Sequence, residues 1–485
     1  MFRETPLQLS PESQAFYEAW FEQHYSEQPD QLPVLEQIWD LDQHVMAFLA
    51  PAFSVRGAPA RDVLRVMRAL LLLFLKNIRS EKHLVEEQLR TNVLYRFFVR
   101  LDQDETVTEA FRIRMVRLRQ RIMRRLGPER WQAFLAETVA LARRSAPAPP
   151  EPPPSAPPVM ASAASVTVEP PPSAPPPAGP APLQAVPSVT GIDPGRVTFD
   201  LTSAKGRARL LDRRDNPERK IIHPTSAGDP DCYWITKKRP GGRAEVTLGY
   251  EGGLFSEWVG GLITGVVVRE QGEENKLAFN GWVDQYQQAW PVGPGQLTVS
   301  TDREFFTGQI LRHAESQHQT LLMPSVTIHP RQGKLDQRYF TDLPDEDLWV
   351  CHEGVELKRT GYDAKKKGAR YQAPTSACDR CPTASICKSG TGPRRLFRSD
   401  FAPEFARARQ REQTPQFKAA RRAQPVYAEG SFAHSNCLHG LDRARYDGHH
   451  QMVLQSYLTA AAMNLKKACR WAMTRSAHVV TVAAA

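Results

Sequence analysis

The chain has 485 residues, a length at which a single hydrophobic core rarely suffices, so we expect two or more domains. Its net charge of +10 favours an anionic partner, with nucleic acid as the first candidate and an acidic membrane surface as the second. Seven cysteines, an odd number, argue against a secreted disulfide framework, and neither a signal peptide nor an apolar run long enough to span a bilayer is recognised, so we expect a cytoplasmic protein.

Residues 1–145 are predicted to be helical throughout. Ser10 and Pro11 have the residue types preferred at a helix N-cap and at the first helical position. Apolar residues then recur at helical spacing in several sets, among them Phe16, Trp20, Phe21, Leu41, Val45, Phe48, Val63, Met67 and Leu70. This region is therefore predicted to be an all-α domain.

One predicted helix, 111–126, is unusually rich in arginine. A stripe of five apolar residues spaced for one helix face begins at Phe111, and seven arginines fill the remaining faces. Because guanidinium groups suit bidentate phosphate contacts, we expect this helix to bind the DNA backbone. The expected DNA-binding residues are Arg112, Arg114, Arg117, Arg121, Arg124 and Arg125. The alternative is a solvated basic face that pairs with Asp102, Asp104 and Glu105.

From residue 146 to 190 the composition changes to proline, alanine and serine, with dense proline blocks at 147–158 and 170–182. Such a segment cannot bury a core, so we predict a semi-stiff linker that leans toward polyproline II. It marks the clearest domain boundary in the sequence.

After the linker, predicted strands alternate with predicted helices. Residues 197–200 and 297–302 each read as a strand that ends on an acid, and 261–269 is a continuous β-branched run. The intervening segment 275–290 has helical spacing. This alternation favours a mixed sheet covered by helices, an α/β fold.

Near the C-terminus, Glu429 opens a segment with helical spacing in which Phe432, Cys437 and Leu438 share a face. A second apolar-periodic segment follows at 449–471. Three basic residues lie between the two segments: His439, Arg443 and Arg445. A carboxylate followed by basic residues suits metal-assisted chemistry on a phosphodiester. Alternatively, a glutamate in a first helical turn only complements the helix dipole.

These residues carry a resemblance. Glu429-Gly-Ser-Phe-Ala, then His439-Gly-x-x-Arg-Ala-Arg-Tyr446 and finally Asn464-Leu-Lys-Lys467 resemble the C-terminal signature of bacterial insertion-sequence DDE transposases. The subgroup it resembles has an RNase H-like catalytic domain with a cysteine-bearing insertion. Residues 62–98 more loosely resemble the helical N-terminal domain of the same enzymes. The chain departs from related groups at Pro425 and Asn436, which stand at the positions nearest to a basic residue of the family pattern.

The resemblance implies a catalytic triad of acids that hold two Mg²⁺ or Mn²⁺ ions. Asp302, in Ser-Thr-Asp-Arg-Glu-Phe-Phe-Thr-Gly, resembles the second catalytic aspartate, and Glu429 resembles the catalytic glutamate. For the first aspartate we choose Asp200, because residues 197–200 have a strand pattern, over Asp193, where Pro194 interrupts one. Asp229 and Asp231 stand in the order expected for an Asp-Pro-Asp sequence of the family, which is a landmark of the pattern and not a metal ligand.

A cysteine cluster lies between the second and third predicted acids. Cys378 and Cys381 have the spacing of a zinc knuckle, and closely spaced thiolates chelate Zn²⁺ well. The family's insertion has the same order of cysteines, so we predict a structural zinc bound by Cys351, Cys378, Cys381 and Cys387, with His352 as a substitute ligand. The alternative is a set of reduced, unliganded thiols.

The resemblance implies a transposase that cleaves double-stranded DNA at element ends and transfers the strands into target DNA, as a homodimer on DNA in the bacterial cytoplasm. A resolvase-type nuclease, suggested by Gly191-Ile-Asp-Pro-Gly195, and a non-catalytic transposase-derived DNA-binding protein remain as alternatives. The expected segments are the helical domain 1–145, the linker 146–190, the two parts of an RNase H-like catalytic domain at 191–330 and 401–475, the zinc-type insertion 331–400 and the tail 476–485.

Overall fold

The computed structural model describes residues 8–24, 30–53, 62–147, 190–192, 198–200, 229, 231–238, 244–258, 260–270, 275–291, 297–325, 335–388 and 390–483. The chain divides into two compact units. One contains Met1–Leu126, Ala136–Glu251 and Arg443–Ala485, and the other contains Gly127–Leu135 and Gly252–Asp442. The predicted linker 146–190 lies almost entirely outside the described residues.

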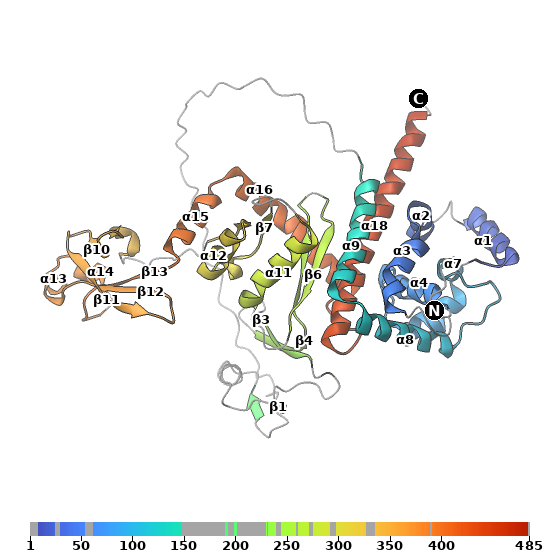
Figure 1. Ribbon diagram of the computed structural model, residues 1–485, viewed down its shortest axis with the longest axis horizontal. Coiled ribbons are helices and arrows are strands. Elements are labelled where there is room, and N and C mark those ends of the chain that lie inside the picture. Colours follow the sequence, from blue (N-terminus) through green and yellow to red (C-terminus); the bar gives the residue numbers. More distant parts are fainter. Residues whose placement is uncertain are drawn as a thin grey trace, which may run out of the picture. The chain divides into compact units, whose positions relative to one another are not determined.

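The N-terminal region is helical, as predicted (Figure 1). Its longer helices are α1 (Pro11–His24), α2 (Gln31–Ile38), α3 (Leu41–Leu49), α4 (Val63–Leu75), α7 (Val93–Val99), α8 (Glu109–Arg125) and α9 (Pro128–Ser145). Short helical segments complete it: η1 (Ala50–Ala52), α5 (Glu81–His83), η2 (Leu84–Gln88) and α6 (Leu89–Thr91). Side-chain oxygens cap several of these helices, and the hydroxyl of Ser10 accepts a hydrogen bond from the Ser13 N–H at 3.2 Å.

Helix α4 is the centre of this region, because Leu64 and every residue from Val66 to Leu75 are buried. The long helix α18 (His449–Ala483) packs against α2 and α4 within the same unit. Helix α18 thus completes the hydrophobic core of the N-terminal helices. No helix in the described part of the chain is both long and apolar enough to cross a membrane.

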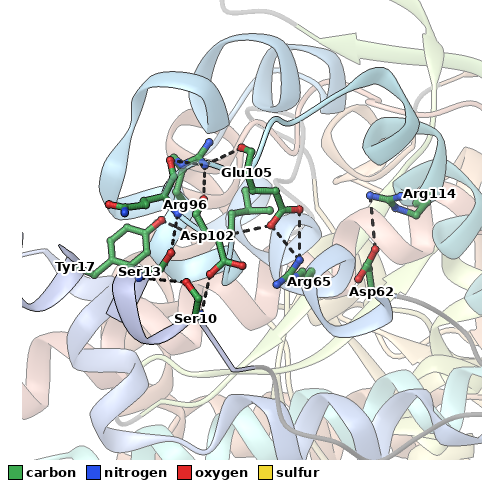
Figure 2. A network of polar contacts seen from close by, with 11 residues as sticks. Ser10, Ser13, Tyr17, Asp62, Arg65, Arg96, Asp102, Glu105 and Arg114 are labelled. Carbon is green, nitrogen blue, oxygen red and sulfur yellow. Dashed lines mark hydrogen bonds and ion pairs between the residues drawn. The ribbon is translucent and has the colours of Figure 1, made fainter. Parts of the chain in front are cut away.

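A polar network fixes the loop between α7 and α8 (Figure 2). Arg96 donates to the carbonyl oxygens of Asp102 at 2.5 Å and Glu105 at 2.8 Å. The Asp102 carboxylate accepts the Ser10 N–H at 2.8 Å, and Glu105 pairs with Arg65 at 3.1 Å. These two acids therefore pair with other partners than the arginines of α8.

The α/β region begins with antiparallel pairs. β1 (Thr190–Ile192) pairs with β2 (Thr198–Asp200), β3 (Tyr233–Lys238) with β4 (Ala244–Gly249), and β5 (Gly252–Ser256) with β6 (Ile263–Val268). Helix α11 (Asn275–Ala289) follows. The predicted strand 261–269 and helix 275–290 are thus confirmed to within a few residues.

A parallel βαβ unit places the second predicted acid. β7 (Thr298–Ser300) leads through η3 (Arg303–Phe305) and α12 (Gly308–Ser316) to β8 (Thr320–Leu322), and the two strands pair in parallel. Its core joins α11, α12, β8 and α15 (Ala402–Glu412) through Phe279, Val283, Ile310, Leu311, Leu321 and Ala408. This is the mixed α/β layer that the alternation predicted.

A five-stranded antiparallel sheet occupies the range predicted for the insertion. Its strands are β9 (Phe340–Leu343), β10 (Leu348–Cys351), β11 (Glu356–Asp363), β12 (Gly368–Gln372) and β13 (Arg395–Ser399), in sequential order (Figure 1). η4 (Gln337–Tyr339) precedes the sheet, and α13 (Thr375–Asp379) and α14 (Ala384–Cys387) connect its last two strands. The other described strands pair only two by two, so a single RNase H-like sheet is not seen among them.

The helix that carries Glu429 differs from the prediction. α16 (Pro415–Gln424), the π turn η5 (Pro425–Glu429) and α17 (Gly430–His439) follow without a break, so Glu429 lies inside a helical stretch instead of at its start. The helix-dipole interpretation is therefore wrong. Phe432, Cys437 and Leu438, which were predicted to share a face, are all exposed. The buried face consists of Ser431, Ser435 and His439.

Candidate active site

The position of Glu429 follows from Pro425. Proline has no N–H to donate to the preceding turn and its ring crowds that turn, so a regular α-helix cannot continue through it. The helix widens instead, and the Gly430 N–H donates to the carbonyl of Pro425, five residues earlier. The hydroxyl of Ser256, at the end of β5, donates to the Tyr427 carbonyl at 3.0 Å. Such π turns occur frequently at functional sites, and Glu429 is the last residue of this one.

Asp302 follows β7 directly and is linked to the same helical stretch. Its Oδ1 accepts a hydrogen bond from Nε2 of Gln424 at 2.7 Å. Gln424 is buried, and its Oε1 accepts from Arg421 and, at 3.4 Å, from the Ser300 hydroxyl. Gln424 precedes Glu429 by five residues, which corresponds to about 7 Å along a helix axis. The strand end with Asp302 and the turn with Glu429 therefore share one scaffold.

Both predicted acids are exposed. Within the described ranges, no arginine, lysine or histidine forms an ion pair with Asp302 or Glu429. Their oxygens are hard ligands of the kind that Mg²⁺ and Mn²⁺ prefer. A pair of accessible carboxylates that no cation among the described residues neutralises fits a divalent metal by its donor chemistry.

The first predicted acid is seen only in its backbone. Asp200 ends β2 and pairs with Thr190, but its side chain lies outside the described residues, as does the whole of Asp193. In the described part of the chain, no three or more His, Cys, Asp or Glu side chains are placed to hold a metal ion. With the Asp200 side chain outside this set, the completeness of the acidic triad stays a prediction.

The four cysteines of the insertion lie around the core of the five-stranded sheet. Cys387 is buried, and Cys351 and Cys378 pack against the same core. Burial raises the pKa of the Cys387 thiol, and the proximity of Cys378, Cys381 and Cys351 raises it further.

The surroundings of these sulfurs are those of ordinary side chains. The Arg394 N–H donates to Cys378 at 3.5 Å, and Cys381 contacts the Thr383 hydroxyl at 3.1 Å. The substitute ligand His352 contacts the same hydroxyl at 2.7 Å. Because no metal-binding group is found among the described side chains, the predicted zinc site is not supported.

The basic residues behind Glu429 have different environments. Arg445 donates to the Ile78 carbonyl and to Asn77 Oδ1 at 2.6 Å, and burial lowers its pKa. It holds the chain before α18 against the N-terminal helices. His439 is buried, whereas Arg443 is exposed. Of the three predicted DNA-binding residues here, Arg443 alone presents its charge to solvent.

The arginines of α8 divide into two sets. Arg112 pairs with Glu109, Arg114 with Asp62 at 3.7 Å (Figure 2) and Arg119 with Glu81 at 2.9 Å. The second set is exposed and, within the described ranges, forms no ion pair: Arg117, Arg121, Arg124 and Arg125. The spacing of this second set is i, i+4, i+7 and i+8, so its members form one stripe, named here the arginine stripe. The predicted apolar stripe is confirmed as the buried face of the same helix.

One feature of the site was missed by sequence reasoning. Gln424 was given no role, because an isolated glutamine before a proline has no recognisable signal. Asp229 and Asp231 prove to be structural: the Tyr250 hydroxyl donates to Asp229 at 2.6 Å, and the His449 N–H donates to Asp231 at 3.0 Å. Asp231 thereby accepts from the first turn of α18, where an acid is favourable.

Comparison with protein families gives two matches. Residues 350–469 match a family described as "Transposase DDE domain", and residues 20–121 match one described as "Transposase domain (DUF772)". The first match includes Glu429 and the insertion cysteines but begins after Asp302, and the second includes most of α8. Neither the comparison with curated proteins nor the comparison with solved structures gave a match.

Proposed function

We propose that this chain, which belongs to the insertion-sequence DDE transposases, cleaves DNA at element ends and joins the freed ends to target DNA. The observation that carries the proposal is the hydrogen-bonded link between the strand end with Asp302 and the helical stretch with Glu429. It connects two acids from distant parts of the sequence, and neither acid forms an ion pair with a cation among the residues that the structure describes.

In this mechanism Asp302 and Glu429, with Asp200 as the third acid, hold the divalent cations by their carboxylate oxygens. Two Mg²⁺ or Mn²⁺ ions, when bound, neutralise charge on the scissile phosphate and activate the attacking oxygen. The first attack is by water and leaves a 3′-hydroxyl. That hydroxyl then attacks a second phosphodiester, which makes the joining step a transesterification.

The arginine stripe of α8 supplies the grip on the DNA backbone in this proposal. Among the described residues no carboxylate pairs with its guanidinium groups, so their N–H donors are free to bind phosphates. Arg443 is a further candidate for phosphate contact. Double-stranded DNA is thus the partner, both as element end and as target, and a homodimer would hold two ends together.

The test is metal-dependent nicking of supercoiled plasmid by the full chain. We expect nicking with Mg²⁺ or Mn²⁺, and Asp302→Asn and Glu429→Gln should each reduce it by about 100-fold or more, since removing a metal ligand costs at least as much as removing its supporting partner. Asp345→Asn is the matched control, because Asp345 is an exposed acid in the turn between β9 and β10. It should nick at the wild-type rate.

Two further comparisons separate the alternatives. Asp200→Asn and Asp193→Asn, made in parallel, identify the first acid by which of them loses nicking. A pre-cleaved oligonucleotide with a 3′-hydroxyl end tests joining to plasmid, which a resolvase-type nuclease would not catalyse. Tight DNA binding without nicking under either metal would overturn the catalytic proposal in favour of a binding protein.

A further inference from the structure

We propose that Gln424 is a positioning residue that sets the carboxylate of Asp302 for metal binding. The inference rests on the proposed function, because it assigns Asp302 as a metal ligand. Gln424 itself would touch neither metal nor DNA. Its role would be to hold Asp302 at a fixed orientation relative to the turn that carries Glu429.

The orientation of the Gln424 amide is determined by its surroundings. Its Oε1 accepts hydrogen bonds from Arg421 and from the Ser300 hydroxyl. Two donors converge on that atom, so it must be the oxygen, and the amide nitrogen must face Asp302. The 2.7 Å contact is therefore an N–H donated to a carboxylate.

This bond occupies one carboxylate oxygen of Asp302 and leaves the other oxygen accessible. Oδ1 accepts from Gln424, whereas no side chain or backbone group in the described ranges donates to Oδ2. A hydrogen bond to one carboxylate oxygen stops the group from rotating and directs the second oxygen outward. Outer partners of this kind orient metal ligands in many metal sites, and their loss typically lowers metal affinity or activity about 10- to 100-fold.

The burial of Gln424 adds to the argument. Only 7% of it is exposed, on an otherwise polar and arginine-rich helix, and a buried amide is retained only where its hydrogen bonds are made. Both ends of this amide are satisfied, one by the strand end and one by Arg421 of its own helix. Gln424 thus couples the position of β7 to that of η5.

The test variant is Gln424→Met, which keeps the length and volume of the side chain and removes the amide. The matched control is Gln410→Met on α15, where the glutamine is exposed and makes no side-chain hydrogen bond within the described ranges. Both variants are made in the full chain, and thermal unfolding establishes that each is folded. Asp302→Asn serves as the reference for complete loss of the ligand.

Two readouts are measured for each variant. The first is Mn²⁺ binding in the absence of DNA, followed by the electron paramagnetic resonance signal of free Mn²⁺. The second is the Mg²⁺ concentration that gives half-maximal plasmid nicking. We expect Gln424→Met to weaken both by about 10-fold or more, Gln410→Met to change neither, and plasmid affinity to stay at the wild-type value.

The outcomes separate this inference from the proposed function. Wild-type Mn²⁺ affinity and metal dependence in a folded Gln424→Met variant would overturn the positioning role, while loss in Asp302→Asn would leave the proposed function intact. If the wild type shows no nicking, the proposed function fails, and Mn²⁺ binding still decides the role of Gln424. Equal Mn²⁺ binding by wild type, Gln424→Met and Asp302→Asn would overturn it.

Discussion

Two groups of charged residues in this chain have opposite environments. Around Arg68, in the helical region, the charges are buried or partly buried, and all are paired: the guanidinium contacts Glu36, Asp42 at 2.6 Å and the Phe98 carbonyl at 2.9 Å. At the candidate active site, Asp302 and Glu429 are exposed, and no cation of the described residues pairs with them. The difference teaches that a charge with complete internal partners serves the fold, whereas a charge without them is available to a ligand.

The largest expected effect comes from breaking the buried group. Arg68→Met should lower the free energy of unfolding by about 3–5 kcal/mol, because Asp42 would lose its ion-pair partner in a partly buried site and Glu36 would keep only Arg100. Urea denaturation at neutral pH measures the loss. Arg117→Met, on the exposed stripe of α8, should change the stability by less than about 0.5 kcal/mol.

A further variant sharpens this result. Adding Asp42→Asn to Arg68→Met removes the stranded charge and should recover part of the lost stability, while Glu36 stays paired with Arg100. Equal stability of Arg68→Met and wild type would show that the buried group does not hold the helices together. Such a result would contradict the claim that charges with complete internal partners stabilise the fold.

The next-largest effect is expected at the arginine stripe of α8, whose cations are available to bind phosphate. Replacing Arg117, Arg121 and Arg124 of the arginine stripe by glutamine should weaken plasmid binding and reduce the slope of log affinity against log salt by about 2–3, since each phosphate contact contributes about 0.9 to that slope. Filter binding across a salt series measures it. The matched control replaces Arg112 and Arg114, which already pair with Glu109 and Asp62 and should contribute less. Equal slopes in both variants would show that the arginine stripe and the ion-paired arginines contribute alike to DNA binding.

Local patterns in the sequence predicted much of this fold. The apolar stripe of α8, the β-branched run of β6 and the helical spacing of α11 each reflect neighbours within one element, so periodicity alone identifies them. Pairing is different, because it joins residues that are distant in sequence. Gln424 and Asp302 are 122 residues apart, and nothing in either local sequence indicates the other.

The local sequence pattern also does not indicate which face of the helix after Glu429 is buried. The spacing of Phe432, Cys437 and Leu438 correctly predicted a helix, but the side that packs carries Ser431, Ser435 and His439. Serine can be buried there because the Ser435 hydroxyl donates to the Phe432 carbonyl of its own helix at 2.7 Å. A buried face made of polar residues leaves no apolar pattern from which it could be predicted.

The smallest effect is expected at Asp102, a partly exposed acid whose hydrogen bond from Ser10 should also stabilise the fold. The hydrogen bond from Ser10 holds the pKa of Asp102 below its usual value of 3.8. A carboxyl group with a lowered folded pKa contributes stability above its unfolded pKa, and that contribution is lost as the pH falls through the folded value. Asp102→Asn should thus cost about 1 kcal/mol or less at pH 7, and its difference from wild type should vanish below the folded pKa.

Urea denaturation of both proteins between pH 7 and pH 3 measures this convergence, with Asp104→Asn as the control, because Asp104 is exposed and accepts no side-chain hydrogen bond within the described ranges. A difference that stays constant over this range would mean that the shape of the side chain, and not its charge, stabilises the start of α1. Convergence would instead show that the hydrogen bonds to the charged carboxylate, from the Ser10 N–H and from the side chains of Ser10 and Ser13, make this acid part of the fold. The role proposed for Gln424 rests on the same physics, because its N–H is donated to a charged carboxylate and would orient it.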